Sequence, residues 1–178
     1  MVYIMGYELE NVRGNIVLFE ADFIVNASNT KLILGSGVSM AFKRHCGLRL
    51  QQEMDDVRKQ FMQLQTPIQQ GDVVATSSGD ATNFKYALHA AVINYNKSVS
   101  QASRKPSLKT IEAILLNAEP YLQWFSEKFN KTPTAIFPYL GCGVGGLNMI
   151  EVQGSFEAFS QREIKFDAKI KLCKYANE

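Results

Sequence analysis

Apolar and polar positions follow two different periods along the chain. Six apolar segments, rich in β-branched and aromatic residues and closed by turn-forming residues, predict strands. Between them, other segments repeat apolar residues every three or four positions, which predicts amphipathic helices. Strands that alternate with helices favour a three-layer α/β/α domain with a largely parallel or mixed sheet. The predicted strands are residues 2–10, 21–27, 71–77, 85–93, 134–140 and 168–175.

The clearest helical pattern runs from about Ser107 to Phe129 and begins directly after Pro106, one place earlier than the usual first-turn proline. Further helices are predicted to begin near Val38, to span residues 48–64 and to follow Asn148. The most polar stretch, residues 94–105, is the segment expected to be most mobile.

The overall composition is that of a folded protein with one core. A length of 178 residues, with 46% hydrophobic and 20% charged residues, predicts a single domain over residues 1–178. A formal charge of +2 without a block of like charges disfavours broad electrostatic binding to nucleic acid. No leader or membrane span is recognised, and three cysteines, an odd number, suggest free thiols in a reducing compartment. We therefore expect a cytoplasmic location.

Residues 137–148, FPYLGCGVGGLN, place four glycines directly after an apolar strand. Glycine serves where the backbone needs a positive φ or where a ligand approaches main-chain N–H groups. The spacing matches G-x-G-x-x-G, and Glu163 stands near the acidic position of a dinucleotide fold. Too little chain follows to build that fold, so the interpretation retained is a phosphate-binding loop.

A second glycine loop, Gly35-Ser36-Gly37, leads into the helix that begins near Val38. A loop that opens a helix offers unpaired N–H groups and the positive end of the helix dipole. Two such loops after two strands can hold two phosphates or one diphosphate. For one loop alone, a tight turn is an equally good explanation.

Asn26 and Asn29, which precede this second loop, carry two interpretations. Their amides can form turns through bonds to nearby backbone, or they can bind a pair of ribose hydroxyls.

Other candidate groups give weaker signals. Cys142 can be a nucleophilic thiolate, but a small residue whose N–H faces a phosphate is the favoured interpretation. The acidic cluster Glu53, Asp55 and Asp56 is most simply a solvated helix face. Neither a metal site nor a cofactor is expected.

Together these stretches resemble the macrodomain family, which is associated with ADP-ribose binding and Appr-1-p processing. Residues 22–47, DFIVNASNTKLILGSGVSMAFKRHCG, are similar to its first signature, a strand, V-N-A-A-N and a glycine turn into a helix. GDVVATSSG, KYALHAAV and AIFPYLGCGVGGL follow in the family's order, so the resemblance extends from about Asn11 to Tyr175.

The resemblance implies that ADP-ribose lies across the carboxyl ends of the strands, with its diphosphate between the two glycine loops. Asn29 would position the terminal ribose and is the one candidate catalytic residue. Tyr175 would stack on adenine, although it can equally be an ordinary terminal tyrosine. The implied ligand-binding residues are Asn15, Ile16, Asn26, Asn29, Gly35, Ser36, Gly37, Val38, Ser39, Gly141, Cys142, Gly143, Val144, Gly145 and Tyr175.

The chain departs from the family pattern at two positions. Asn15 stands where many members have an aspartate that accepts from the adenine amino group, which suggests weaker adenine selectivity. Ser39 stands where efficient hydrolases often have an aspartate, and Val144-Gly145 replaces the second-loop aspartate of another branch. General acid–base catalysis therefore has no obvious agent in either loop.

Three functions stay open on the sequence alone. The chain can bind ADP-ribose or ADP-ribosylated protein as a reader. It can slowly hydrolyse ADP-ribosyl-protein, ADP-ribose 1″-phosphate or O-acetyl-ADP-ribose by positioning the substrate. A binder of RNA or another nucleotide is the third hypothesis, which the near-neutral charge disfavours. The sequence does not indicate an oligomeric state.

Overall fold

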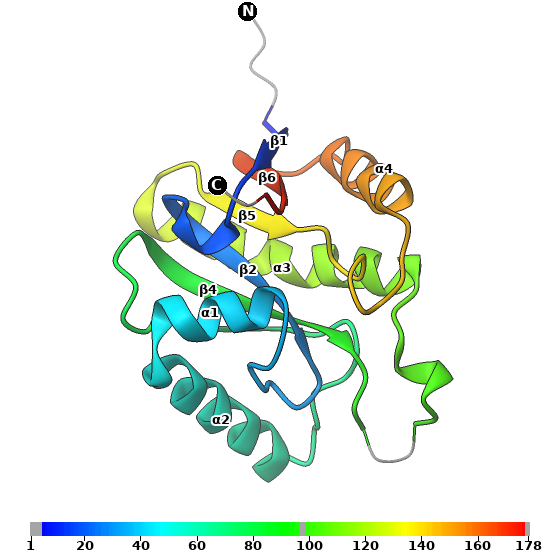
Figure 1. The fold of residues 1–178 in the computed structure, drawn as a ribbon. Coiled ribbons are helices and arrows are strands. Elements are labelled where there is room, and N and C mark those ends of the chain that lie inside the picture. Colours follow the sequence, from blue (N-terminus) through cyan, green and yellow to red (C-terminus); the bar gives the residue numbers. More distant parts are fainter. Residues whose placement is uncertain (1–4, 97–98, 177–178) are drawn as a thin grey trace, which may run out of the picture.

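A six-stranded sheet organises the computed structural model, which describes residues 5–96 and 99–176 (Figure 1). The strand order is β1-β6-β5-β2-β4-β3. All neighbouring pairs are parallel except β3 and β4, so the expected mixed sheet is confirmed. The strands are β1 (Tyr7–Arg13), β2 (Ala21–Asn29), β3 (Val73–Ser77), β4 (Phe84–Ile93), β5 (Thr134–Pro138) and β6 (Ala168–Lys174).

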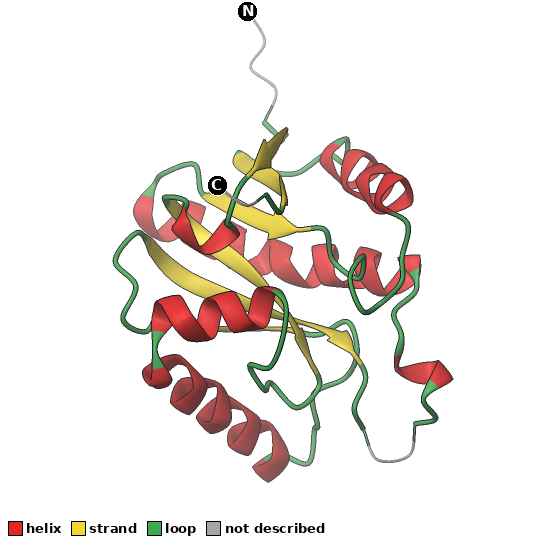
Figure 2. Cartoon of the chain, in the orientation of Figure 1, coloured by secondary structure: helices red, strands yellow, loops and turns green. Residues whose placement is uncertain are grey.

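Helices cover both faces of this sheet (Figure 2). Side chains of a strand alternate between faces, so in β2 Phe23 contributes to one core cluster and Ile24 to the other. The first cluster contains residues of α3 and α4, and the second contains residues of α1 and α2. The helices are α1 (Val38–Cys46), α2 (Leu48–Gln63), α3 (Leu108–Phe129) and α4 (Met149–Ser160), with the short 3-10 helices η1 (Ile16–Leu18) and η2 (Ala102–Arg104).

The element boundaries follow the sequence patterns closely, with one clear shift. Ser107 caps α3 in a capping box with Thr110, as its place after Pro106 suggested. The first strand was predicted over residues 2–10, but it begins at Tyr7 and continues to Arg13. Its length is set by pairing with β6, residue for residue, and not by its own apolar pattern. Residues 1–4 lie outside the described part of the chain.

The polar segment after β4 is partly ordered by backbone bonds. Asn94 N–H donates to the carbonyl of Arg104 across the segment, at 2.9 Å. Residues 97–98, at the centre of the segment expected to be mobile, lie outside the described residues. Within the described residues, no helix combines the length and apolar character needed to cross a membrane.

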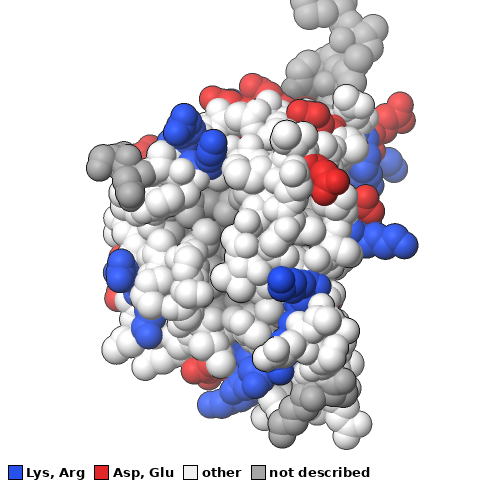
Figure 3. Space-filling model, turned by 45° about the vertical axis from the view of Figure 1, so that its right-hand side comes forward, with Lys and Arg blue, Asp and Glu red and all other residues white. Residues whose placement is uncertain are grey.

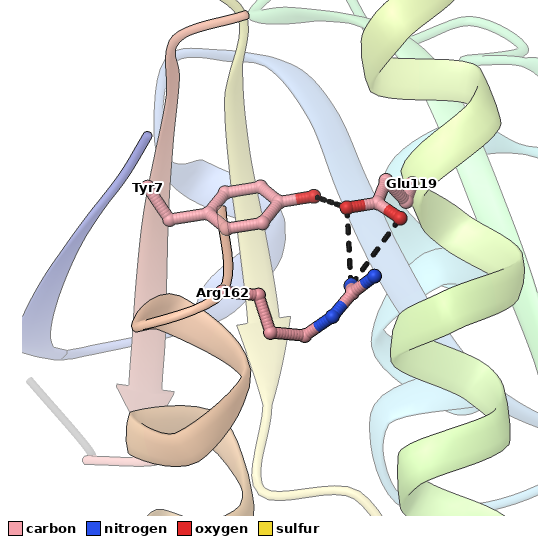
Figure 4. A network of polar contacts seen from close by, with 3 residues as sticks. All are labelled: Tyr7, Glu119 and Arg162. Atoms are coloured by element: carbon pink, nitrogen blue, oxygen red, sulfur yellow. Dashed lines mark hydrogen bonds and ion pairs between the residues drawn. The ribbon is translucent and has the colours of Figure 1, made fainter. Parts of the chain in front are cut away.

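A polar cluster joins the outer strand β1 to the helical layer (Figure 4). The hydroxyl of Tyr7 donates to Glu119 Oε1 at 2.6 Å, and Arg162 Nη1 reaches both carboxylate oxygens at 3.1 and 3.3 Å. Burial, with the adjacent Glu119 carboxylate, raises the pKa of Tyr7 far above its ordinary value. The hydroxyl therefore stays protonated and ties β1 to α3 at the amino end of the strand.

Replacing Phe125 by alanine tests the packing of α3 on the sheet. Phe125 is fully buried and packs edge-on against Phe23 of β2, so we expect a loss of about 3 to 5 kcal/mol in the free energy of unfolding. Urea denaturation followed by circular dichroism measures this change. Leu116→Ala on the same helix is the control, because Leu116 is 47% exposed. Equal losses in the two variants would contradict this account of the core.

Candidate ligand-binding site

Three adjoining hollows form one cleft at the carboxyl ends of the central strands. The first, of about 580 Å³, lies between η1 and α1. The second, of about 300 Å³, shares Ile16, Val38 and Tyr175 with the first. The third, of about 380 Å³, shares Val38, Tyr139 and Gly143 with the second. Because Val38 lines all three, the hollows are parts of a single groove.

The first glycine loop forms one wall of the third hollow and opens α1. Gly37 has a φ of +59° at the N-cap position, where no side chain caps the helix. A Cβ added at Gly35 or Gly37 would meet nothing within 4 Å, so the space above the loop is open. Within the described chain the N–H groups of Val38 and Ser39 have no acceptor. These two N–H groups can donate hydrogen bonds to an anion in the cleft.

The second glycine loop forms the opposite wall of the third hollow. Its positions require glycine for different structural reasons. Gly141 has a φ of +76°, and a Cβ there would lie 2.7 Å from Leu147. A Cβ at Gly145 would lie 2.6 Å from the carbonyl oxygen of Gly141. A Cβ at Gly143 would meet nothing within 4 Å. Gly141 and Gly145 therefore shape the loop, whereas Gly143 leaves room in the cleft.

The N–H of Cys142 was predicted to face a phosphate, but in the structure it has a hydrogen-bond partner within the loop. The N–H of Cys142 donates to the carbonyl of Tyr139 at 3.2 Å, so it is not available to a phosphate. In the described chain, the N–H groups of Gly143, Val144 and Gly145 have no such acceptor. Burial raises the pKa of the Cys142 thiol, which also disfavours the alternative of a reactive thiolate.

Asn26 was expected to contact the ligand, and the structure corrects this prediction. Its side chain is fully buried and lines none of the three hollows. Its Nδ2 lies 3.0 Å from Nδ1 of His89, and its Oδ1 accepts from the Ser39 hydroxyl at 3.0 Å. The reason is strand alternation, which points Asn26 under α1. Its contribution to the cleft is to hold Ser39.

Asn29 lies at the cleft, but its amide already forms a local turn. Its Oδ1 accepts from the N–H groups of Lys31 and Ile33, at 3.1 and 3.3 Å. Its Nδ2 donates to the carbonyl of Ile33 at 3.0 Å. This is the turn-forming interpretation, and it leaves one N–H of the amide for a ligand.

The other predicted residues do line the cleft. Asn15 caps η1, with its Oδ1 accepting from Val17 N–H at 3.4 Å, and it lines the first hollow with Ile16 and Tyr175. Cys142 lines the second hollow. The third hollow is lined by Asn29, Gly35, Ser36, Gly37, Val38, Ser39, Gly141, Gly143, Val144 and Gly145, among others.

No aspartate or glutamate lines any of the three hollows within the described residues. The charged side chains that do are Arg44 in the first hollow and Lys174 in the second, neither of which the motifs predicted. The acidic cluster of α2 lies elsewhere, and there Glu53 accepts from the Ser77 hydroxyl. Among the described residues, the cleft thus offers positive charge to an anionic ligand and no carboxylate that could act as a base.

His89 was not predicted to support the site, and it is fully buried beneath it. Burial lowers its pKa from the ordinary value of 6.5 to about 3, so the ring is neutral at physiological pH. Its two nitrogens contact Asn26 and Thr76, at 3.0 and 2.8 Å. A polar residue within an apolar strand was the available signal, since buried polar groups need partners.

The family model described as Macro domain matches residues 25–155, a range that contains both glycine loops. The chain belongs to the Macro domain family. This confirms the resemblance drawn from the motifs.

Curated relatives of this macrodomain include an uncharacterized protein of Saccharolobus solfataricus, 39% identical over 90 residues, which are 51% of this chain and 48% of the relative. An uncharacterized protein of Aquifex aeolicus is 27% identical over 140 residues, 79% of this chain and 73% of the relative. The chain thus spans about half the length of the first relatives it matches.

Solved macrodomains have the same fold. A mutant macrodomain of Oceanobacillus iheyensis, described with ADPR, superposes with a TM-score of 0.72 at 22% identity, covering 96% of this chain and 88% of the other. A Trypanosoma brucei macrodomain in complex with ADP-ribose gives 0.66 at 20% identity, covering 93% and 63%.

The buried His89 makes stability depend on pH. In the unfolded chain the ring takes up a proton near pH 6.5, whereas in the folded protein it does so only near pH 3. The unfolded state therefore binds more protons in this window, and we expect the free energy of unfolding to fall as pH decreases from about 6.5 towards 3. Denaturant titrations at several pH values measure this dependence.

His89→Leu is the matched variant, because leucine cannot take up the proton. Its free energy of unfolding should fall less steeply over the same window, after correction for its lower stability at neutral pH. Identical slopes for both proteins would show that His89 does not resist protonation in the folded state.

Proposed function

We propose that this protein binds ADP-ribose, free or attached to protein, with the diphosphate held between the two glycine loops. The observation that carries the proposal is that free N–H donors line both sides of one cleft. Val38 and Ser39 supply them from one loop, and Gly143, Val144 and Gly145 from the other. Backbone donors at a helix N-terminus and in a glycine loop bind phosphate without a positive side chain.

The two ends of the cleft fit the two ends of such a ligand. Asn15, Ile16 and Tyr175 lie together in the first hollow, where an apolar wall and an exposed aromatic ring can hold a base. The third hollow, lined by Asn29 and Ser39, offers polar groups to a terminal sugar. In this assignment adenine contacts the side-chain amide of Asn15, where many family members have a carboxylate. Selectivity for the base therefore rests on weaker hydrogen bonds.

Binding without efficient cleavage is the function that the cleft supports best. Hydrolysis needs a group to activate water, and the described cleft has neither a carboxylate nor a thiol with a lowered pKa. The remaining contribution would be positioning by Asn29, whose amide is largely used in its own turn. We therefore favour a reader of ADP-ribose over a hydrolase.

RNA binding is disfavoured by the formal charge of +2, which is small for a protein that holds a polyanion. Figure 3 shows one face of the molecule, on which lysine and arginine side chains gather in the lower part and acidic side chains lie mainly towards the top and the right. A polyanion is normally held by a continuous basic stripe.

A reducing, cytoplasmic location stays part of the proposal, and the free thiols of Cys46, Cys142 and Cys173 agree with it.

Gly143→Glu tests the cleft without disturbing the fold. A side chain at Gly143 meets open space, so the carboxylate enters the cleft and repels a diphosphate. We expect ADP-ribose binding, measured by titration calorimetry, to be lost, with an unchanged melting temperature. Gly145→Ala is the structural control, which should lower the melting temperature because its Cβ meets the Gly141 carbonyl. Undiminished binding by Gly143→Glu would place the ligand elsewhere.

Turnover is tested separately on ADP-ribosylated protein. Because no aspartate or glutamate lines the described cleft, we expect the modification to persist during long incubation with a large excess of this protein. Release of ADP-ribose, followed by chromatography, at a rate that Asn29→Ala abolishes would establish a hydrolase acting by positioning.

A further inference from the structure

The third hollow continues past the two glycine loops to the carboxyl end of β4. There it is lined by Ile33, Val92, Ile93 and Tyr95. Ile33 and Tyr95 are 49% and 37% exposed, so their side chains form part of the rim of the hollow and not its floor. This rim lies beyond the residues assigned to the terminal sugar, and a group attached to that sugar would meet it.

Arg104 stands beside this rim in a fixed position. Its guanidinium carbon lies 5.8 Å from the centre of the Tyr95 ring, a distance at which a cation and an aromatic face attract. Its carbonyl oxygen accepts from the N–H of Asn94 at 2.9 Å and from Nε2 of Gln70 at 3.3 Å. The end of β4 therefore sets the place of this arginine, and Tyr95 supports its side chain.

The charge of Arg104 is not neutralised by the described part of the chain. The ion pairs found there are formed by other cations. Its Nε is buried and has no hydrogen-bond partner among the described residues. Asp72, which precedes β3, uses its carboxylate to accept from the N–H of Gln69 at 2.8 Å. A half-buried guanidinium without a counter-charge favours an anion that arrives from outside.

Charge is unevenly distributed along the sequence around the cleft. None of the 17 acidic residues of the chain lies in residues 23–52, 81–111 or 128–150. These three segments contain most of β2 and all of β4 and β5, together with the loops that follow them at the carboxyl edge. Lys31 and Lys105, both exposed, lie in these loops next to the rim residues in sequence. The loops around the third hollow thus carry only positive charge, although the whole chain is nearly neutral.

We propose that the rim formed by Ile33, Tyr95 and Arg104 binds the acceptor segment of an ADP-ribosylated protein, and favours segments with acidic side chains beside the modified residue. The inference rests on the proposed function, which places the terminal sugar in the third hollow. Protein is joined to ADP-ribose through that sugar, so the attached chain leaves the cleft across this rim. Arg104 and Lys105 then pair with the carboxylates of the segment.

The apolar part of the rim favours a peptide over a nucleic acid. Ile33 and Val144, which is 78% exposed, also line the third hollow and can contact the aliphatic parts of a peptide. A single-stranded nucleic acid needs a groove of cations along its backbone and aromatic faces for its bases. The rim offers one such ring, Tyr95, and Arg104 already lies over it.

The test uses two synthetic peptides that carry ADP-ribose on one serine. In the first peptide a glutamate stands on each side of the modified serine, and in the second both glutamates are glutamines. Titration calorimetry with the wild-type protein at low salt should show roughly threefold to fivefold tighter binding of the acidic peptide, the range for one or two exposed ion pairs. High salt should reduce this preference. Equal affinities at low salt would overturn the inference.

Arg104→Gln tests whether the rim is the source of the preference. This variant removes the charge and keeps a polar side chain, so the two peptides should bind it almost equally. Its affinity for free ADP-ribose should stay within about twofold of wild type, because Arg104 lines none of the three hollows. Arg49→Gln is the matched control, since Arg49 is exposed on α2 and also lines none of them. An equal reduction in both variants would show a general effect of charge and overturn the role of the rim.

The remaining outcomes separate this inference from the proposed function. If the wild-type protein does not bind free ADP-ribose, the proposed function fails, and neither a peptide nor a variant is needed to see it. Binding of free ADP-ribose but of neither peptide would overturn the inference alone, because the rim would then exclude attached protein. A single-stranded RNA that displaces the acidic peptide but not the neutral one would assign the rim to nucleic acid, and would also overturn it.

Discussion

The separation of β2 and β5 is the constraint on which the cleft depends. These neighbouring parallel strands pair only at Phe23 with Ala135 and at Ile24 with Ile136. Beyond these two pairs, β2 remains paired with β4, while β5 remains paired with β6. The chain leaves β2 towards the helices of one face and leaves β5 towards α4 on the other. Such a switch point opens a crevice outside the carboxyl ends of the strands, and each strand delivers a glycine loop to it.

Much of this arrangement can be predicted from the sequence because its causes are local. An apolar strand followed by glycines marks each loop, and helical periodicity marks the layers that cover the sheet. Ser107 at the start of α3 shows the same locality, since a cap depends on residues three places apart. The mixed sheet and the family followed from the order of such signals along the chain.

The remaining features arise from pairings between distant residues, which no local pattern encodes. Asn26 has the composition of a ligand-binding residue, yet its partner is His89, on a different strand. Cys142 sits in a glycine loop, yet its N–H is used by Tyr139 in the turn that forms the loop. Strand β1 extends past its apolar residues because β6 pairs with it. In each case the partner, and not the residue type, decides the role.

The parallel pairing of β1 and β6 also determines how another protein could be joined to this one. Tyr7 begins β1 at the amino ends of the parallel strands, on the side of the sheet away from the cleft. β6 ends at Lys174, next to Tyr175 in the first hollow. A domain linked beyond Tyr175 would therefore leave from the mouth of the cleft. A domain linked ahead of Tyr7 would stand at the far edge, clear of the opening.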